Sequence, residues 1–151
     1  KARKLGYKSK IILSGRKLND NFVDYINDNI NIYFSKKYKS KKMKALIMGV
    51  TFKENCPDIR NSKVFELIKK MKKNFSVDVY DPYASKKEVL NKYNIKLKDY
   101  NTLSEKKYHC ILIAVSHKEF LNLDIELLCK NKNSLIYDLK GIYNNKKYMR
   151  L

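Results

Sequence analysis

The stretch Ala45-Leu46-Ile47-Met48-Gly49-Val50 is a continuous apolar run without a charged residue. A run of this kind is typical of a parallel strand, because helices cover both faces of a parallel sheet. After a polar loop, apolar residues recur at the spacing of an amphipathic helix: Val64, Leu67, Ile68 and Met71. The order strand, loop, helix is the first part of a β-α-β unit, so this segment predicts a parallel sheet.

The same alternation continues toward the C-terminus. Short apolar runs predict further strands at 77–80, 110–115 and 135–138. Helices are expected between them, over about 84–93 and over 119–128. Strands that alternate with helices imply right-handed crossovers. The predicted fold class is α/β: a long N-terminal helix followed by a Rossmann-like parallel sheet flanked by helices.

The block before the sheet has another pattern. Apolar residues recur about every four positions within 4–36, which predicts a long amphipathic helix: Phe22, Val23, Ile26, Ile30 and Phe34. Ser and Lys dominate the residues that follow, as in a linker. We therefore divide the chain into 1–36, a linker at 37–44 and an α/β domain at 45–151. The helix either docks a partner or packs on its own domain, and the sequence leaves both open.

The chain is strongly basic, with 34 Lys and Arg against 15 Asp and Glu and a net charge of +19. Such a balance suits nucleic acid, a membrane surface or an anionic small molecule. The lysines are scattered over the linker, one helix end and the C-terminal residues, so we expect no nucleic-acid partner. No apolar run approaches the roughly 18 residues of a membrane helix, so no membrane partner is expected either. A basic nucleic-acid-binding module is kept as an alternative.

The three cysteines are odd in number, and no C-x-x-C pair occurs among them. This spacing predicts neither a zinc site nor a disulfide framework, and no metal is expected. Cys110 and Cys129 fall in apolar runs and are expected to be reduced core thiols, which suits the cytoplasm. Cys56 lies in a loop without a neighbouring His, so a packing role is favoured over a nucleophilic one.

Ligands of such sheets bind outside the carboxyl ends of the strands. This rule nominates the loops 51–62, 81–85, 116–118 and 139–141. The first loop contains neither G-x-G-x-x-G nor a Walker A pattern, but it places Lys53 and Arg60 around a helix N-terminus. Cationic side chains beside free helix amides suit a diphosphate, although both could simply face solvent.

Three residues near the start of this helix could cap it by accepting a hydrogen bond from a free amide: Asp58, Asn61 and Ser62. His117 follows the 110–115 run, at the end of a predicted strand. It could touch a nucleotide, but a structural or solvent-facing role is the simpler interpretation.

The segment Phe52-Lys53 followed by Pro57-Asp58-Ile59-Arg60-Asn61-Ser62 resembles the F-K-x-x-x-x-D-x-R-x-S motif of the UDP-glucose/GDP-mannose dehydrogenase family. The fuller run FKENCPDIRNSKV is similar to the bacterial subgroup that acts on UDP-N-acetylhexosamines in capsule, Vi-antigen or O-antigen synthesis. Weaker matches occur in order along nearly the whole chain: 5–7, 12–20, 77–82, 114–117 and 137–140.

The resemblance implies an NAD-dependent oxidoreductase as the parent protein. Family members use NAD twice to oxidise C6 of a nucleotide sugar to a carboxylate, through a cysteine thiohemiacetal and thioester. It further implies that 1–36 is part of a central helix that forms a homodimer, and that 45–151 binds the UDP-sugar. UDP-N-acetylhexosamine is the expected substrate, with UDP-glucose and UDP-N-acetylmannosamine as alternatives.

The family's roles transfer to five positions. Lys53 matches the Lys that contacts the nucleotide sugar, and Phe52 supplies backbone contacts beside it. Arg60 matches the Arg that reaches the NAD diphosphate. Arg16 matches a helix Arg that reaches the adjacent subunit's substrate site, and Lys140 matches a basic residue near the substrate.

Two family segments are missing from the chain. The nucleophile's Gly-Gly-x-Cys-x-x-x-Asp segment and the G-x-G-x-x-G fingerprint of the NAD fold do not occur. No catalytic residue is therefore assigned, and the chain by itself is expected to be inactive, as a fragment of a longer enzyme. A stand-alone dimerisation piece without nucleotide affinity is the remaining alternative.

Overall fold

A computed structural model describes residues 10–35 and 43–151, with side chains described from residue 21 onward. The chain divides into two compact units, Lys1–Lys39 and Ser40–Leu151. In the first unit, helix α1 runs over Lys10–Ser35. The apolar periodicity of the sequence thus predicted this helix correctly over its described length. The role of the helix as a dimer element stays a prediction.

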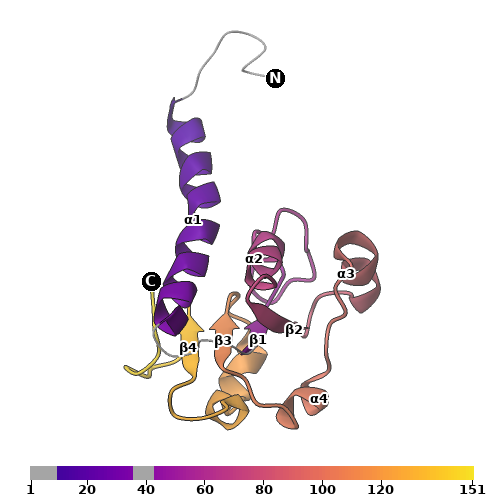
Figure 1. The fold of residues 1–151 in the computed structure, drawn as a ribbon. Coiled ribbons are helices and arrows are strands. Elements are labelled where there is room, and N and C mark those ends of the chain that lie inside the picture. Colours follow the sequence, from indigo (N-terminus) through magenta and orange to yellow (C-terminus); the bar gives the residue numbers. More distant parts are fainter. Residues whose placement is uncertain (1–9, 36–42) are drawn as a thin grey trace. The chain divides into compact units, whose positions relative to one another are not determined.

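The second unit is built on a parallel sheet of four strands in the order β2-β1-β3-β4. The strands are β1 (Met43–Met48), β2 (Phe75–Tyr80), β3 (Cys110–Ile113) and β4 (Leu135–Asp138). Figure 1 shows this order across the sheet, from β4 on the left to β2 on the right. The predicted Rossmann-like parallel sheet is confirmed. Its first strand takes in Met43 and Lys44, which were expected in the linker.

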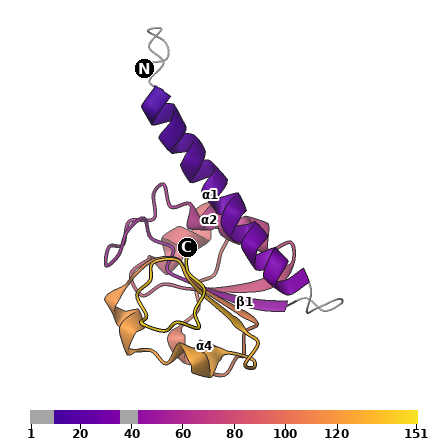
Figure 2. The ribbon, with the colours of Figure 1, turned by 90° about the vertical axis from the view of Figure 1, so that its left-hand side faces the viewer.

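Helices cover both sides of the sheet. Helix α2 (Val64–Met71) turns a strongly apolar face inward and buries Phe65, Leu67, Ile68 and Met71. Figure 2 shows α2 on one side of the sheet and α4 (Tyr100–Ser104) on the other. Helix α3 (Lys86–Tyr93) follows β2, close to the expected 84–93. Ser85 caps α3 by accepting a hydrogen bond from the Glu88 N–H (3.3 Å), as in a capping box.

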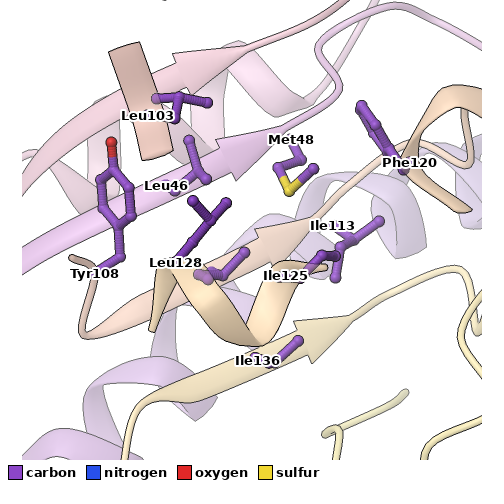
Figure 3. Packing of buried hydrophobic residues seen from close by; sticks show 10 residues of the cluster. Leu46, Met48, Leu103, Tyr108, Ile113, Phe120, Ile125, Leu128 and Ile136 are labelled. Carbon is purple, nitrogen blue, oxygen red and sulfur yellow. The ribbon is translucent and has the colours of Figure 1, made fainter. Parts of the chain in front are cut away.

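The α4 side of the sheet carries an apolar cluster. Leu46 and Met48 of β1, with Ile111 and Ile113 of β3, meet residues of the covering helices in it. Figure 3 shows Leu46, Met48 and Ile113 facing the covering residues, which are Leu103, Phe120, Ile125 and Leu128. The alternation of side chains along each strand sends the intervening residues to the α2 side.

The single helix expected over 119–128 is wrong. Two short 3₁₀ helices occupy this region, η2 (Lys118–Asn122) and η3 (Ile125–Leu128). The backbone of Leu123 is extended, and the Asp124 carboxylate accepts a hydrogen bond from the Glu126 N–H (3.2 Å), which starts the second turn afresh. Three residues per turn still bury Phe120, Ile125 and Leu128, so the apolar pattern suited either kind of helix. The five-residue helix α4 lacks an apolar repeat and was not predicted.

Strand β1 ends where the chain turns at Gly49. This residue has φ +88°, in the region that L side chains rarely adopt. A Cβ at this position would lie 2.6 Å from Val115 Cβ and 2.9 Å from Val115 N. The loop after β1 and the loop after β3 therefore approach each other at a point where only glycine fits.

Gly49→Ala is expected to lower the free energy of unfolding by more than about 3 kcal/mol, because left-handed strain and a clash with backbone add together. Gly141→Ala is the matched control: its φ is +64°, but nothing lies within 4 Å of the added Cβ. The control should cost only about 1–2 kcal/mol. Urea unfolding of both variants measures the difference, and equal losses would contradict the close approach.

Candidate functional site

The carboxyl ends of the four strands lie in one row. Met48 pairs with Tyr80 on one side and with Ile113 on the other, and Ile113 pairs with Asp138. The four loops nominated from the sequence therefore leave the same edge of the sheet. Connections from β1 and β3 run to opposite sides of the sheet, so the switch point lies between these two strands. Open α/β sheets bind ligands at this point.

The loop between β1 and α2 has a closed base and an exposed tip. The Phe52 N–H donates to the Asp58 carbonyl (2.7 Å), and Ile59 is buried beneath the loop. The tip is formed by residues 52–54. Lys53 is exposed, and the Phe52 ring is 60% exposed although it is aromatic. The loop thus presents an ammonium group and an apolar ring beside the switch point.

Asp81 lies beneath this loop as a buried hydrogen-bond acceptor. Its Oδ2 accepts from the N–H groups of Val50 (2.6 Å) and Thr51 (3.2 Å) after β1. Its Oδ1 accepts from the N–H groups of Tyr83 and Ala84, both at 2.8 Å, after β2. The carboxylate therefore ties the loop after β1 to the loop after β2.

His117 adds the loop after β3 to this arrangement. Its side chain is fully buried, with Nε2 3.1 Å from Asp81 Oδ2 and 3.2 Å from Thr51 Oγ1. Its Nδ1 accepts a hydrogen bond from the Asn55 N–H (3.0 Å). A ring nitrogen that accepts carries no proton, so the proton is on Nε2 and points toward Asp81 and Thr51.

The hydrogen bonds keep Asp81 ionised. Burial by itself raises the pKa of this carboxyl, but the donors around it, His117 and the Val50 amide foremost, outweigh burial and leave the pKa below its ordinary value. A folded-state pKa below the unfolded one stabilises the protein above the unfolded pKa of about 4. This stabilisation is lost as the pH falls from there toward the folded pKa.

Arg60 is exposed and pairs with Asp58. Its Nε and Nη2 donate to the two carboxylate oxygens at 2.9 and 2.8 Å, and its backbone N–H donates to Oδ1 at 2.9 Å. Hydrogen bonds from this guanidinium lower the pKa of Asp58 to about 2. Asp58 is thus occupied, and no side chain caps α2 at Lys63. The N-cap position of α2 is therefore Lys63 and not one of the three residues that the sequence offered as caps, Asp58, Asn61 and Ser62.

The other predicted site residues lie apart from this network. Lys140 is exposed in the loop after β4, and its backbone N–H donates to the buried Asp138 carboxylate (3.2 Å). The side chain of Arg16 lies outside the described residues. The structure places Phe52, Lys53 and Arg60 on one loop and Lys140 on another loop of the same edge.

Sequence reasoning nominated the loops that carry Asp81 and His117 but did not single out Asp81, and it left the contacts of His117 undecided. The positions of both residues just after strands were the available signal. Cys110 is buried, Cys129 and Cys56 are half-buried, and all three are free thiols. Burial raises the pKa of the Cys110 thiol, which makes it a poor nucleophile.

Two further properties concern the part of the chain that the structure describes. Within residues 10–35 and 43–151, no helix is long and apolar enough to cross a membrane. Among the same residues, no three His, Cys, Asp or Glu side chains gather in a way that could hold a metal ion.

Comparison with known proteins identifies the family of this domain. Residues 46–145 match the model of the UDP-glucose/GDP-mannose dehydrogenase family, UDP binding domain. The chain is 36% identical over 151 residues to the UDP-N-acetyl-D-glucosamine 6-dehydrogenase of Pseudomonas aeruginosa, covering 97% of this chain and 35% of that protein. It is 37% identical over 147 residues to the enzyme of the same name from Salmonella typhi, covering 94% and 34%.

A solved structure shares the fold. The UDP-N-acetyl-mannosamine dehydrogenase Cap5O of Staphylococcus aureus superposes with a TM-score of 0.72 at 23% identity, covering 95% of this chain and 33% of that one. The chain thus spans about a third of the length of the curated relatives it matches.

Asp81→Asn is expected to lower the free energy of unfolding by about 3 kcal/mol, because an amide cannot accept from all the buried donors that the carboxylate satisfies. The wild type should lose stability as the pH falls below about 4, and the variant should lose less over that range. Asp99→Asn is the control, since the Asp99 carboxylate is exposed and forms an ion pair with Lys86 at the surface. Urea unfolding at pH 7 and pH 3 tests this, and a flat wild-type profile would contradict it.

Proposed function

Because this chain belongs to the UDP-glucose/GDP-mannose dehydrogenase family, we propose that its Ser40–Leu151 unit binds the UDP part of a UDP-sugar. The diphosphate lies at the tip of the loop between β1 and α2, residues 52–54. The observation that carries this proposal is the exposed Lys53 ammonium at the switch point, on a loop whose base is fixed by buried Asp81 and His117.

The chemistry of the tip suits a diphosphate. The Lys53 ammonium is a compact cation that donates three hydrogen bonds, and the net charge of +19 draws an anion toward the surface. The Phe52 ring is exposed to water in the free protein, and covering this apolar surface with a ligand would be favourable. A nucleotide sugar offers both a charged diphosphate and flat or apolar faces to such a pair.

We assign the whole protein's activity to the same class as its relatives. The chain is the C-terminal UDP-binding part of an NAD-dependent UDP-N-acetylhexosamine 6-dehydrogenase, which oxidises C6 of the sugar from alcohol to carboxylate. That oxidation removes four electrons and therefore reduces two NAD. The cysteine nucleophile and the NAD fold belong to the remaining two thirds of the parent, and this chain alone is inactive.

Arg60 is the residue proposed to meet the diphosphate of NAD. Its guanidinium is exposed, lies on the same loop as Lys53, and is held in a fixed orientation by both oxygens of Asp58. Asp58 takes the Nε and Nη2 edge of the guanidinium, and the remaining N–H groups of Nη1 and Nη2 can donate to an anion. The residues present therefore fit a dinucleotide phosphate, while NAD itself supplies the hydride chemistry.

The remaining assignments rest on family membership alone. Lys140 approaches the substrate, and Arg16 reaches the substrate site of the adjacent subunit in a homodimer formed through α1. The protein acts in the cytoplasm in polysaccharide synthesis, such as that of a capsule or O-antigen. UDP-N-acetylglucosamine and UDP-N-acetylgalactosamine are the favoured substrates, with UDP-glucose and UDP-N-acetylmannosamine as alternatives.

Lys53→Ala is expected to weaken UDP binding by this chain about tenfold or more, because a charge-assisted contact to the diphosphate is lost. Lys132→Ala is the matched control, since Lys132 is also exposed but precedes β4 at the opposite edge of the sheet. Isothermal titration with UDP and UDP-N-acetylglucosamine at two salt concentrations measures the effect.

Two results would contradict the proposal. Equal loss in both lysine variants would show that overall charge, and not the loop, holds the ligand. Binding that any polyanion matches and that falls steeply with salt would favour the basic nucleic-acid-binding module.

Arg60→Ala is expected to raise the KM for NAD of the full-length parent several-fold while leaving the UDP affinity of this chain unchanged. Lys53→Ala should give the opposite pattern, with UDP affinity lost and the KM for NAD little affected. Steady-state kinetics of NADH formation with UDP-N-acetylglucosamine, together with UDP titration, separate the two. If the KM for NAD were unaltered in the Arg60→Ala enzyme, the proposed contact between Arg60 and the NAD diphosphate would be wrong.

A further inference from the structure

A single buried imidazole contacts both flanks of the proposed ligand-binding tip. On the N-terminal side, His117 Nε2 lies 3.2 Å from Thr51 Oγ1, and this hydroxyl donates to the Lys53 carbonyl (2.9 Å). On the C-terminal side, His117 Nδ1 accepts from the Asn55 N–H (3.0 Å). Between these two contacts lie only residues 52–54, whose side chains are exposed.

The two flanks are not held equally well. Thr51 has a second attachment, because its N–H also donates to Asp81 Oδ2. Within the part of the chain that the structure describes, Asn55 is held by the loop after β3: its N–H donates to His117, and its Oδ1 accepts from the Lys118 N–H (3.0 Å). Asn55 also has φ +53°, a left-handed conformation that needs support from its surroundings.

The ring itself is held firmly. It lies between Tyr83, at 4.9 Å between centroids, and Phe120, at 5.2 Å. Tyr83 is itself held, because its hydroxyl donates a hydrogen bond to Glu119. Together with Asp81, these contacts allow the imidazole one orientation and one tautomer, with Nδ1 free to accept.

We infer that His117 is a positioning residue for nucleotide binding: its Nδ1 fixes Asn55 and thereby sets the backbone of the 52–54 tip in the shape that meets the diphosphate. The inference rests on the proposed UDP-binding function. His117 itself is buried and does not touch the ligand. Its effect passes through the Asn55 amide on one side and through Thr51 on the other.

Two substitutions separate positioning from simple structural support. In His117→Asn, the amide oxygen falls where Nδ1 lies and can still accept from Asn55, but the bond to Asp81 is lost. In His117→Gln, the amide nitrogen falls where Nε2 lies and can still donate to Asp81, but Asn55 loses its acceptor. If His117 only stabilised the fold, affinity would follow stability in both variants.

The test is titration of the chain with UDP alongside thermal unfolding and amide hydrogen exchange, for the wild type and both variants. His117→Gln should bind UDP about tenfold more weakly and exchange the Asn55 amide faster, with near wild-type stability. His117→Asn should melt at a lower temperature, yet bind UDP within a few-fold of the wild type at temperatures where it is folded.

A second pair of variants keeps the test informative if a His117 variant does not fold. Asn55 and Asn94 both have φ 53° and both are exposed, but Asn94 ends α3 and has no part in the site. Asn55→Ala keeps the backbone N–H that donates to His117 but removes the oxygen that accepts from Lys118, so it loosens the same end of the tip by its other attachment. Both variants should suffer similar backbone strain, while only Asn55→Ala should weaken UDP binding several-fold.

The outcomes distinguish the two ideas. A wild type that binds UDP, with affinity in the variants that simply follows stability or does not change, overturns the positioning role and leaves the proposed function intact. A wild type that does not bind UDP overturns the proposed function, and the positioning role falls with it.

Discussion

The buried carboxylate of Asp81 is the interaction on which the rest of the site depends. A buried anion is costly unless donors surround it, and here amides from two loops and one imidazole do so. Because these donors belong to the segments after β1, β2 and β3, satisfying one charge fixes three connections at the carboxyl edge of the sheet. The loop that carries Lys53 is therefore positioned mainly by the hydrogen bonds at its base.

This arrangement separates two tasks along one short segment. Residues at the base of the loop form hydrogen bonds within the protein. Phe52 and Lys53 at the tip are exposed to solvent. An anion can thus be bound without the glycine-rich turn that usually wraps a phosphate, since a side-chain ammonium replaces a set of backbone amides. The fixed base limits the conformational entropy that the tip would lose on binding.

The loop also shows why its turns are made by asparagine. Asn55 and Asn61 both take positive φ values, where asparagine is tolerated and can hydrogen-bond its neighbours. At Asn55 the side chain is used, since its oxygen accepts from Lys118. Gly49 is different, because the proximity of Val115 leaves no room for any Cβ. A positive φ can therefore be occupied by asparagine where there is room for a side chain, but requires glycine where a neighbour lies too close.

The sequence by itself determined the strands, the α/β class and the family, because apolar runs and the 52–62 motif are local patterns. It also placed Phe52, Lys53 and Arg60 on one loop. Only the tertiary structure decided that Asp81 and His117 meet, since they lie 36 residues apart and strand order alone brings them together. It likewise paired Arg60 with Asp58 and divided 119–128 into two 3₁₀ turns, because competing hydrogen bonds of similar strength are settled by the surrounding packing and not by residue spacing.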